Sequence, residues 1–407
     1  MSSSPRSVAP FLVLETADTE RHAGVICGLD GLDGRERWRF VMERDHVIPP
    51  NGLATDGDVV YAATTAGWVY ALRTEDGSLL WQHDTAHQPL SPHDTLDMRL
   101  VAGGGIVAVD YIRPDLPAST GRCITALDGQ DGSERWVAHG LQTVIPRMLL
   151  PGRLSRPWQV GLYLLGADGT GVYVSASRSD HGPHRPDWQR TILLDRQTGR
   201  RRWSTRQAAA LNFAGHWGSR TTVAAAGGST FTLGKHLSAL DTTGGRVRWS
   251  RPVPSGDGIR LGPLVADETV LCAAYEALFQ VHRAADGALL WQLVPHAGRT
   301  RYLGGFLGMV LLDDGVYVGH HADHPGHFVV EARDARTGAL RWEWPRLEAS
   351  GQQQVPARAD ISWRLVGAAG VLYVPGPTTI TAVRASDGEQ LWQWPRGGLP
   401  PLAALSA

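Results

Sequence analysis

A glycine followed four positions later by a tryptophan recurs eight times along this chain of 407 residues. Each pair lies in an apolar, strand-like stretch such as ITALDGQDGSERW, and successive tryptophans are 42 to 67 residues apart. A repeat of this length with β-type sequence is typical of propellers and solenoids, so it constrains the fold more than any other feature. The pairs are Gly34/Trp38, Gly77/Trp81, Gly132/Trp136, Gly199/Trp203, Gly245/Trp249, Gly287/Trp291, Gly338/Trp342 and Gly388/Trp392.

Residues 51–84 show what one repeat encodes. Four apolar or β-branched runs, GLAT, VVYAAT, WVYALR and SLLWQHD, are separated by short turn sequences rich in Asp, Gly and Thr. Four strands joined by tight turns are the content of one propeller blade. We therefore predict an all-β fold, an eight-bladed β-propeller of four-stranded antiparallel blades, which forms a single domain over residues 1–407.

The two ends of the chain are predicted to close this ring together. The first apolar run, PFLVLET at residues 10–16, aligns with the second strand of a blade rather than the first. The C-terminal run PPLAAL, residues 400–405, resembles the innermost strands LVAG and LVAD of other repeats. We expect residues 400–405 to supply the innermost strand of the first blade.

The turn before each tryptophan has its own pattern. The glycine is expected at positive φ, and the tryptophan is expected to pack between adjacent blades. Aspartate at the start of a turn can accept a bond from the backbone two residues on, whereas arginine there is expected to pair with a neighbouring blade. Eight residues before the tryptophan stand Asp30, Asp128, Asp195, Asp241 and Asp334, or Arg73, Arg283 and Arg384.

Composition excludes several partners and compartments. The net charge is −1 without a basic run, so nucleic acid is not expected as a partner. The N-terminal apolar run covers only residues 11–14, and no stretch approaches the roughly 20 apolar residues of a membrane helix. Cys27, Cys123 and Cys272 lie in three different repeats, which argues against disulfides. We predict a cytoplasmic protein without a membrane partner.

The A-L-D-x-x-x-G-x-x-x-W pattern resembles the quinoprotein-like β-propeller repeat, also called the PQQ-like repeat. It is complete from Ala126 to Trp136 and from Ala239 to Trp249, and the resemblance covers essentially the whole chain. The resemblance implies the propeller fold, and stand-alone cytoplasmic members of the family are the most similar. It specifies function weakly, because one fold carries many roles.

Two functions of this family are not favoured by the sequence. The resemblance implies that its alcohol dehydrogenases are exported and hold pyrroloquinoline quinone (PQQ) against a disulfide of adjacent cysteines. This chain has neither an adjacent pair nor an export signal, so PQQ is not expected to bind. The outer-membrane assembly propellers of the family are lipoproteins, and no lipid-attachment cysteine follows the first apolar run. No cofactor is predicted, although a divalent metal is left open.

The metal candidate is the segment GHHADHPGH in the seventh repeat. Imidazole and carboxylate groups suit zinc, nickel or iron. Consecutive residues of a strand point to opposite faces, so one site could use only part of the set. The alternatives are a polar surface loop and a role in acid–base chemistry. The candidates are His320, His321, Asp323, His324 and His327.

A second set of residues enters the innermost strands, which should line the central channel. Arginines with aromatic and carboxylate side chains at a funnel mouth can hold an anionic or polar ligand, unless they pair among themselves around water. The long connections and most histidines map to the same face. The candidates are Asp97, Arg99, His216, Trp217, Arg220, Arg260, Arg301, Tyr302, Asp360, Trp363 and Arg364.

Three hypotheses for the function follow. The first is a module that binds a small molecule or a protein on the loop-rich face at the channel mouth. The second is a non-redox enzyme, a lyase, cyclase or hydrolase, that uses histidine, aspartate and arginine in the same funnel. The third, a PQQ-dependent oxidoreductase, is favoured least. The sequence alone does not decide whether the protein is catalytic.

Overall fold

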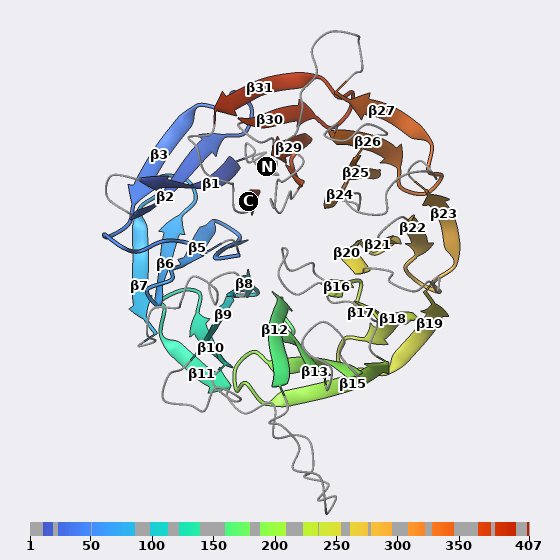
Figure 1. Cartoon of the computed structure of the whole chain (residues 1–407), viewed down its shortest axis with the longest axis horizontal. Coiled ribbons are helices and arrows are strands. Elements are labelled where there is room, and N and C mark those ends of the chain that lie inside the picture. Colours follow the sequence, from blue (N-terminus) through green and yellow to red (C-terminus); the bar gives the residue numbers. More distant parts are fainter. Residues whose placement is uncertain are drawn as a thin grey trace, which may run out of the picture.

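The strands form a ring around a central opening in the computed structural model (Figure 1). The first strands of most sheets, such as β8 and β12, face this opening, and the last strands, such as β7 and β11, form the outer rim. The structure describes residues 11–18, 23–49, 51–85, 98–112, 122–138, 159–179, 188–208, 223–234, 236–253, 261–275, 278–294, 308–321, 328–345, 365–375, 379–395 and 405–406.

Seven blades are each built from four strands that follow one another in the chain, and neighbouring strands are antiparallel. We number them blade 2 to blade 8 in chain order. Blade 2 contains β4 (Leu53–Asp56), β5 (Val59–Ala63), β6 (Trp68–Arg73) and β7 (Leu79–Asp84); blade 3 contains β8 (Leu100–Gly103), β9 (Ile106–Ile112), β10 (Arg122–Asp128) and β11 (Glu134–Ala138); blade 4 contains β12 (Gln159–Ala167), β13 (Gly171–Ser179), β14 (Trp188–Asp195) and β15 (Arg201–Ala208).

The second half of the ring repeats this arrangement in four further blades. Blade 5 contains β16 (Val223–Ala226), β17 (Ser229–Leu233), β18 (His236–Asp241) and β19 (Val247–Pro252); blade 6 contains β20 (Leu261–Ala266), β21 (Val270–Tyr275), β22 (Leu278–Arg283) and β23 (Leu289–Leu293); blade 7 contains β24 (Gly308–Leu312), β25 (Gly315–His321), β26 (Phe328–Asp334) and β27 (Leu340–Trp344); blade 8 contains β28 (Val366–Ala368), β29 (Val371–Pro375), β30 (Thr379–Arg384) and β31 (Gln390–Pro395).

The remaining sheet joins both ends of the chain, and we call it blade 1 only to keep one numbering around the ring. It contains β1 (Phe11–Asp18), β2 (Ala23–Asp30) and β3 (Glu36–Val41), and its innermost strand is the two-residue β32 (Leu405–Ser406). Leu405 is paired with Val13, and β32 lies between the innermost strands of blades 8 and 2.

These sheets confirm the four-stranded antiparallel propeller and correct two details of the prediction. The predicted count of eight is corrected to seven blades that are continuous in the sequence, with the composite sheet in the remaining place of the ring. Only the end of the predicted closing segment is a strand, since β32 begins at residue 405 and residues 400–404 lie outside the described residues.

Each repeat tryptophan lies on the outermost strand of its sheet and packs on the turn glycine of the next sheet. These glycines have φ between +65° and +75°, and a Cβ atom on any of them would lie 2.5–2.9 Å from the tryptophan ring. Each indole N–H also donates to a backbone carbonyl of the next sheet at 2.7–3.0 Å. The series ends where it began, because Trp392 packs on Gly34 and donates to the carbonyl of Gly31.

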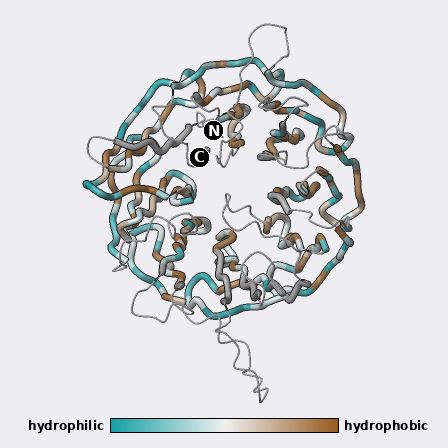
Figure 2. Tube along the Cα trace, in the orientation of Figure 1, coloured by the Kyte–Doolittle hydropathy of each residue, from teal (hydrophilic) through white to brown (hydrophobic). Residues whose placement is uncertain are grey.

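Apolar side chains fill the space between each pair of neighbouring sheets. Blades 2 and 3, for example, bury Tyr61, Trp81 and Val69 against Val107 and Tyr111. An equivalent cluster lies at every other junction of the ring, including the one between blades 8 and 1. Figure 2 shows hydrophobic stretches on the strands inside the rim and hydrophilic stretches along much of the rim.

Five of the turns before the tryptophans are held by an aspartate and an arginine. As predicted, the aspartate accepts a bond from the N–H two residues on, as Asp128 does from Gln130 at 2.8 Å. Its second carboxylate oxygen forms an ion pair with the arginine that precedes the tryptophan. The pairs are Asp30/Arg37, Asp128/Arg135, Asp195/Arg202, Asp241/Arg248 and Asp334/Arg341.

Arginine at the same turn position was expected to pair with a neighbouring blade, and this prediction is wrong for two of the three turns. Arg283 Nη1 lies 3.1 Å from Asp286 Oδ2, and Arg384 Nη1 lies 3.0 Å from Asp387 Oδ2. Both carboxylates belong to the arginine's own turn. The turn is therefore stabilised locally whichever of the two residue types begins it.

The contact between tryptophan and glycine can be tested separately from the strain of positive φ. Gly199 and Gly57 have φ of +65° and +61°, but a Cβ on Gly199 would meet Trp136 at 2.6 Å, whereas one on Gly57 would meet nothing within 4 Å. Both alanine variants should lose about 1–2 kcal/mol of unfolding free energy from backbone strain. Gly199→Ala should lose a further ~1–3 kcal/mol because the indole is displaced. Equal losses in chemical denaturation would contradict the interblade role of this contact.

Removal of the C-terminal strand should destabilise the whole ring. A chain ending at Gly398 lacks β32, which leaves the inner edge of β1 without a hydrogen-bonding partner. We expect a lower melting temperature than that of the full chain in calorimetry. An unchanged melting temperature would show that β32 does not close the ring in solution.

Candidate functional site

The channel residues predicted from the sequence fall almost entirely outside the described residues. Arg99 alone is described, and the structure gives no geometry for the others. The proposed ligand site therefore stays a prediction. The candidates outside the described residues are Asp97, His216, Trp217, Arg220, Arg260, Arg301, Tyr302, Asp360, Trp363 and Arg364.

Arg99 connects two blades just before β8 begins. It is buried, its backbone N–H donates to Asp110 Oδ1 at 2.6 Å, and its Nη1 donates to the carbonyl of Leu164 on β12. The Arg99 carbonyl in turn accepts from the backbone N–H of Asp110 at 3.1 Å. The Arg99 guanidinium therefore already serves a contact between blades 3 and 4.

His320 is the metal candidate whose surroundings the structure describes. It is buried on β25, and its Nε2 lies 3.0 Å from Glu331 Oε1 on the neighbouring strand β26. The other oxygen of Glu331 accepts from Arg333 Nε at 2.6 Å, and Arg333 Nη1 donates to the Gly338 carbonyl. Burial alone would raise the pKa of Glu331, but these bonds from His320 and Arg333 hold it below its usual value.

This network ties two strands and a turn of blade 7 together. His321 lies on β25, and nothing is described of its side chain, while Asp323, His324 and His327 lie outside the described residues. Among the residues that the structure does describe, no three histidine, cysteine, aspartate or glutamate side chains are arranged to hold a metal ion. The metal site remains a prediction.

A buried histidine that is not among the candidates predicted from the sequence lies between blades 1 and 2. His46 Nδ1 lies 2.6 Å from the Tyr70 hydroxyl oxygen, and the imidazole stacks on Trp68 with 5.8 Å between ring centres. Burial raises the pKa of Tyr70 to about 12, so the hydroxyl stays protonated at neutral pH. This arrangement packs the connection from β3 against blade 2.

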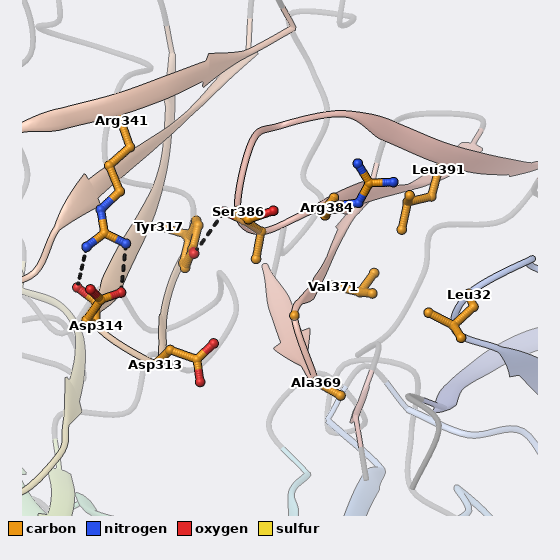
Figure 3. A pocket seen from close by; sticks show the side chains of 12 residues that line it. Leu32, Asp313, Asp314, Tyr317, Arg341, Ala369, Val371, Arg384, Ser386 and Leu391 are labelled. Carbon is orange, nitrogen blue, oxygen red and sulfur yellow. Dashed lines mark hydrogen bonds and ion pairs between the residues drawn. The ribbon is translucent and has the colours of Figure 1, made fainter. Parts of the chain in front are cut away.

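A pocket lies on the face opposite the long connections. It has a volume of about 490 Å³ and is formed by turns of blades 7 and 8 with one residue of blade 1 (Figure 3). Arg341, Arg384, Asp313 and Asp314 give it charge of both signs. Its lining residues are Leu32, Asp313, Asp314, Tyr317, Arg341, Ala369, Gly370, Val371, Arg384, Ala385, Ser386 and Leu391.

The cysteines do not fit the PQQ site that the resemblance implies. Cys27, Cys123 and Cys272 are all buried without disulfides, and no two of them are adjacent in the sequence. Burial raises the pKa of Cys27 to about 12, which keeps the thiol protonated. The chain therefore lacks the disulfide against which the quinone would be held.

The fold and repeat define a β-propeller with PQQ-like repeats, and the comparisons specify the family. The chain belongs to the family described as outer membrane protein assembly factor BamB, which matches residues 17–180 and 189–394. No curated protein matches it significantly. Among the residues that the structure describes, no helix is long and apolar enough to cross a membrane.

Solved structures share the fold at low sequence identity. BamB from Moraxella catarrhalis is 17% identical with a TM-score of 0.50, and the match covers 94% of this chain and 95% of that one. Apo AztD from Citrobacter koseri is 13% identical with a TM-score of 0.59 and covers 98% of both chains. The dihydro-heme d1 dehydrogenase NirN, solved in complex with DHE, is 15% identical with a TM-score of 0.55; the match covers all of this chain and 77% of NirN.

The aspartate–arginine ion pairs should make the free energy of unfolding fall as the pH is lowered into the acid range. The hydrogen bond from Thr337 N–H and the contact with Arg341 lower the pKa of Asp334 from 3.8 to about 2. A carboxylate with a lowered folded pKa stabilises the fold above the unfolded pKa, and this contribution is lost as pH falls from about 4 to 2. Asp334→Asn should therefore lower the denaturation midpoint at pH 6 and change it less near pH 2.5.

A control separates this effect from a general loss of charge. Asp58 lies in a turn of the same face, and its carboxylate has no hydrogen bond or ion pair within the described part of the chain. Asp58→Asn should leave the midpoint nearly unchanged at pH 6. An Asp334→Asn effect of the same size at both pH values would contradict the assignment to this ion pair.

Titration with PQQ and calcium should yield no stoichiometric complex. The physical reason is the absence of adjacent cysteines, since the three thiols lie buried in three different blades. Calorimetry on the purified protein measures this directly. A one-to-one complex would overturn this prediction and favour the oxidoreductase hypothesis.

Proposed function

We propose that the protein is a binding module whose ring presents a ligand or protein site on the face that carries the long connections. One observation carries the proposal. The turns between first and second strands and between third and fourth strands span only two to five residues. The other connections, which leave the opposite ends of the strands, include residues 139–158, 209–222 and 345–365. Long loops on a rigid scaffold commonly carry function.

The described polar side chains support a scaffold more than a catalytic centre. Arg99 bonds a neighbouring blade, His320 bonds Glu331, and His46 bonds Tyr70. The residues available for chemistry then lie in the connections, where Arg220 follows Trp217 and Arg364 follows Asp360 and Trp363. Guanidinium groups at a channel mouth favour a small anionic or polar ligand. The family description, an assembly factor, supports a protein partner as the alternative.

Two further features belong to this proposal. We infer that the composite sheet acts as an eighth blade, because the tryptophan contacts and innermost strands continue through it without a break. We also propose a reducing compartment, the cytoplasm, which suits three buried and unpaired thiols.

The ligand site is tested with two arginine variants and one matched control. A thermal-shift panel of small carboxylates and phosphates identifies a ligand, and calorimetry then measures its Kd. Arg220→Ala and Arg364→Ala should each weaken binding by about 2 kcal/mol, roughly thirtyfold, with the melting temperature unchanged. The control Arg35→Ala removes an exposed guanidinium on the short-turn face and should leave Kd unchanged. A ligand that binds all variants equally would refute this placement.

A further inference from the structure

We propose a second binding site on the short-turn face: the pocket between blades 7, 8 and 1 accepts an alkylammonium group. This site is independent of the function proposed for the long-connection face. It is built from three neighbouring sheets that the chain brings together around the closing point of the ring. Figure 3 shows the side chains that surround it.

The two guanidinium groups of the pocket already have carboxylate partners. Arg341 Nη1 lies 2.7 Å from Asp314 Oδ1, and Arg341 Nη2 lies 2.9 Å from Asp334 Oδ2. Arg384 pairs with Asp387 at 3.0 Å and also with Glu389. These ion pairs raise the pKa of both arginines, with the side-chain hydrogen bonds that the arginines donate to the carboxylates as the main cause. Neither group is left to attract an anion.

One carboxylate of the pocket, in contrast, has no partner among the described residues. Asp313 forms no hydrogen bond or ion pair with any residue that the structure describes, and Figure 3 shows no contact drawn to it. Its backbone has φ of +53°, which fixes it in the turn between β24 and β25. Counting Asp334, Asp387 and Glu389, five carboxylates surround the two arginines. The local field therefore favours a cation.

Apolar side chains form another part of the pocket lining. Val371 and Leu391 of blade 8 line it, and Leu32 of blade 1 contributes a side chain that is 56% exposed. An aliphatic stem that ends in a charged nitrogen fits such a surface, because the stem lies on apolar atoms while the charge stays near the carboxylate and water. A primary amine on a short alkyl chain has this form.

A side-chain contact that joins neighbouring turns between blades 2 and 3 is not made by the described turns at this pocket. Between blades 2 and 3, Asp56 ends the first strand and its Oδ2 accepts from Gly105 N–H in the next turn at 2.8 Å. The residue that ends the first strand of blade 7 is Leu312, which has no polar atom to make this bond. The turn that carries Asp313 and the turn of Ala369 and Gly370 are therefore not joined in this way.

The test uses n-pentylamine and methylamine as probes on the full-length protein, with shift changes in NMR spectra as the readout. Pentylamine should bind more tightly than methylamine because only the longer stem reaches apolar surface. Asp313→Asn should weaken pentylamine binding at least about tenfold, and asparagine tolerates positive φ, so the turn is kept. Leu32→Ser should reduce the preference for the longer amine.

A control variant and a second probe test whether binding depends on the pocket at Asp313. Asp58→Asn removes the same charge from the equivalent turn of blade 2, where no pocket is described, and should leave pentylamine binding unchanged. A short peptide with lysine beside leucine tests whether the amine can be a protein side chain; binding of either probe at Asp313 supports the site. Equal weakening by Asp58→Asn and Asp313→Asn, or shift changes remote from blades 7 and 8, would overturn the proposal.

Discussion

The structure depends on one directional contact that is repeated around the ring. A tryptophan on the outer strand of each sheet covers the turn glycine of the next sheet and donates its indole N–H to that turn. The contact requires a residue without Cβ on one side and a large flat ring on the other, so neither partner can be exchanged alone. Because every contact points the same way, the sheets follow one another in a single sense and end with Trp392 on Gly34.

Local sequence was sufficient for most of the fold because each repeat carries its own turn chemistry. For example, Asp128 indicated a turn closed by its own carboxylate, and Trp136 was correctly predicted to pack between blades. The partner of Arg384 was predicted wrongly, because a neighbouring blade was expected whereas Asp387 of the same turn forms the ion pair. The sequence did contain a pattern that separates the two kinds of turn. The residue before the tryptophan is arginine in the five turns that begin with aspartate and leucine in the three that begin with arginine.

The candidate sites were much less predictable, for a physical reason. Residues such as Arg220 and Arg364 lie in connections whose path is not fixed by any repeat, so their positions in sequence say little about their distances. Where surroundings are described, Arg99 and His320 prove to be engaged in contacts within the fold. The short-turn pocket could not be predicted from the sequence, because Leu32 comes from the other end of the chain and meets blades 7 and 8 only through ring closure.

The pairing of Leu405 with Val13 has a consequence for the order in which the protein forms. These partners are separated by almost the whole chain, so the entropy lost on bringing them together is recovered only when the other sheets are already in place. During synthesis, β1 must wait for residue 405 before it gains its inner neighbour. Until then the growing protein is an arc with an open strand edge, the kind of surface that chaperones protect.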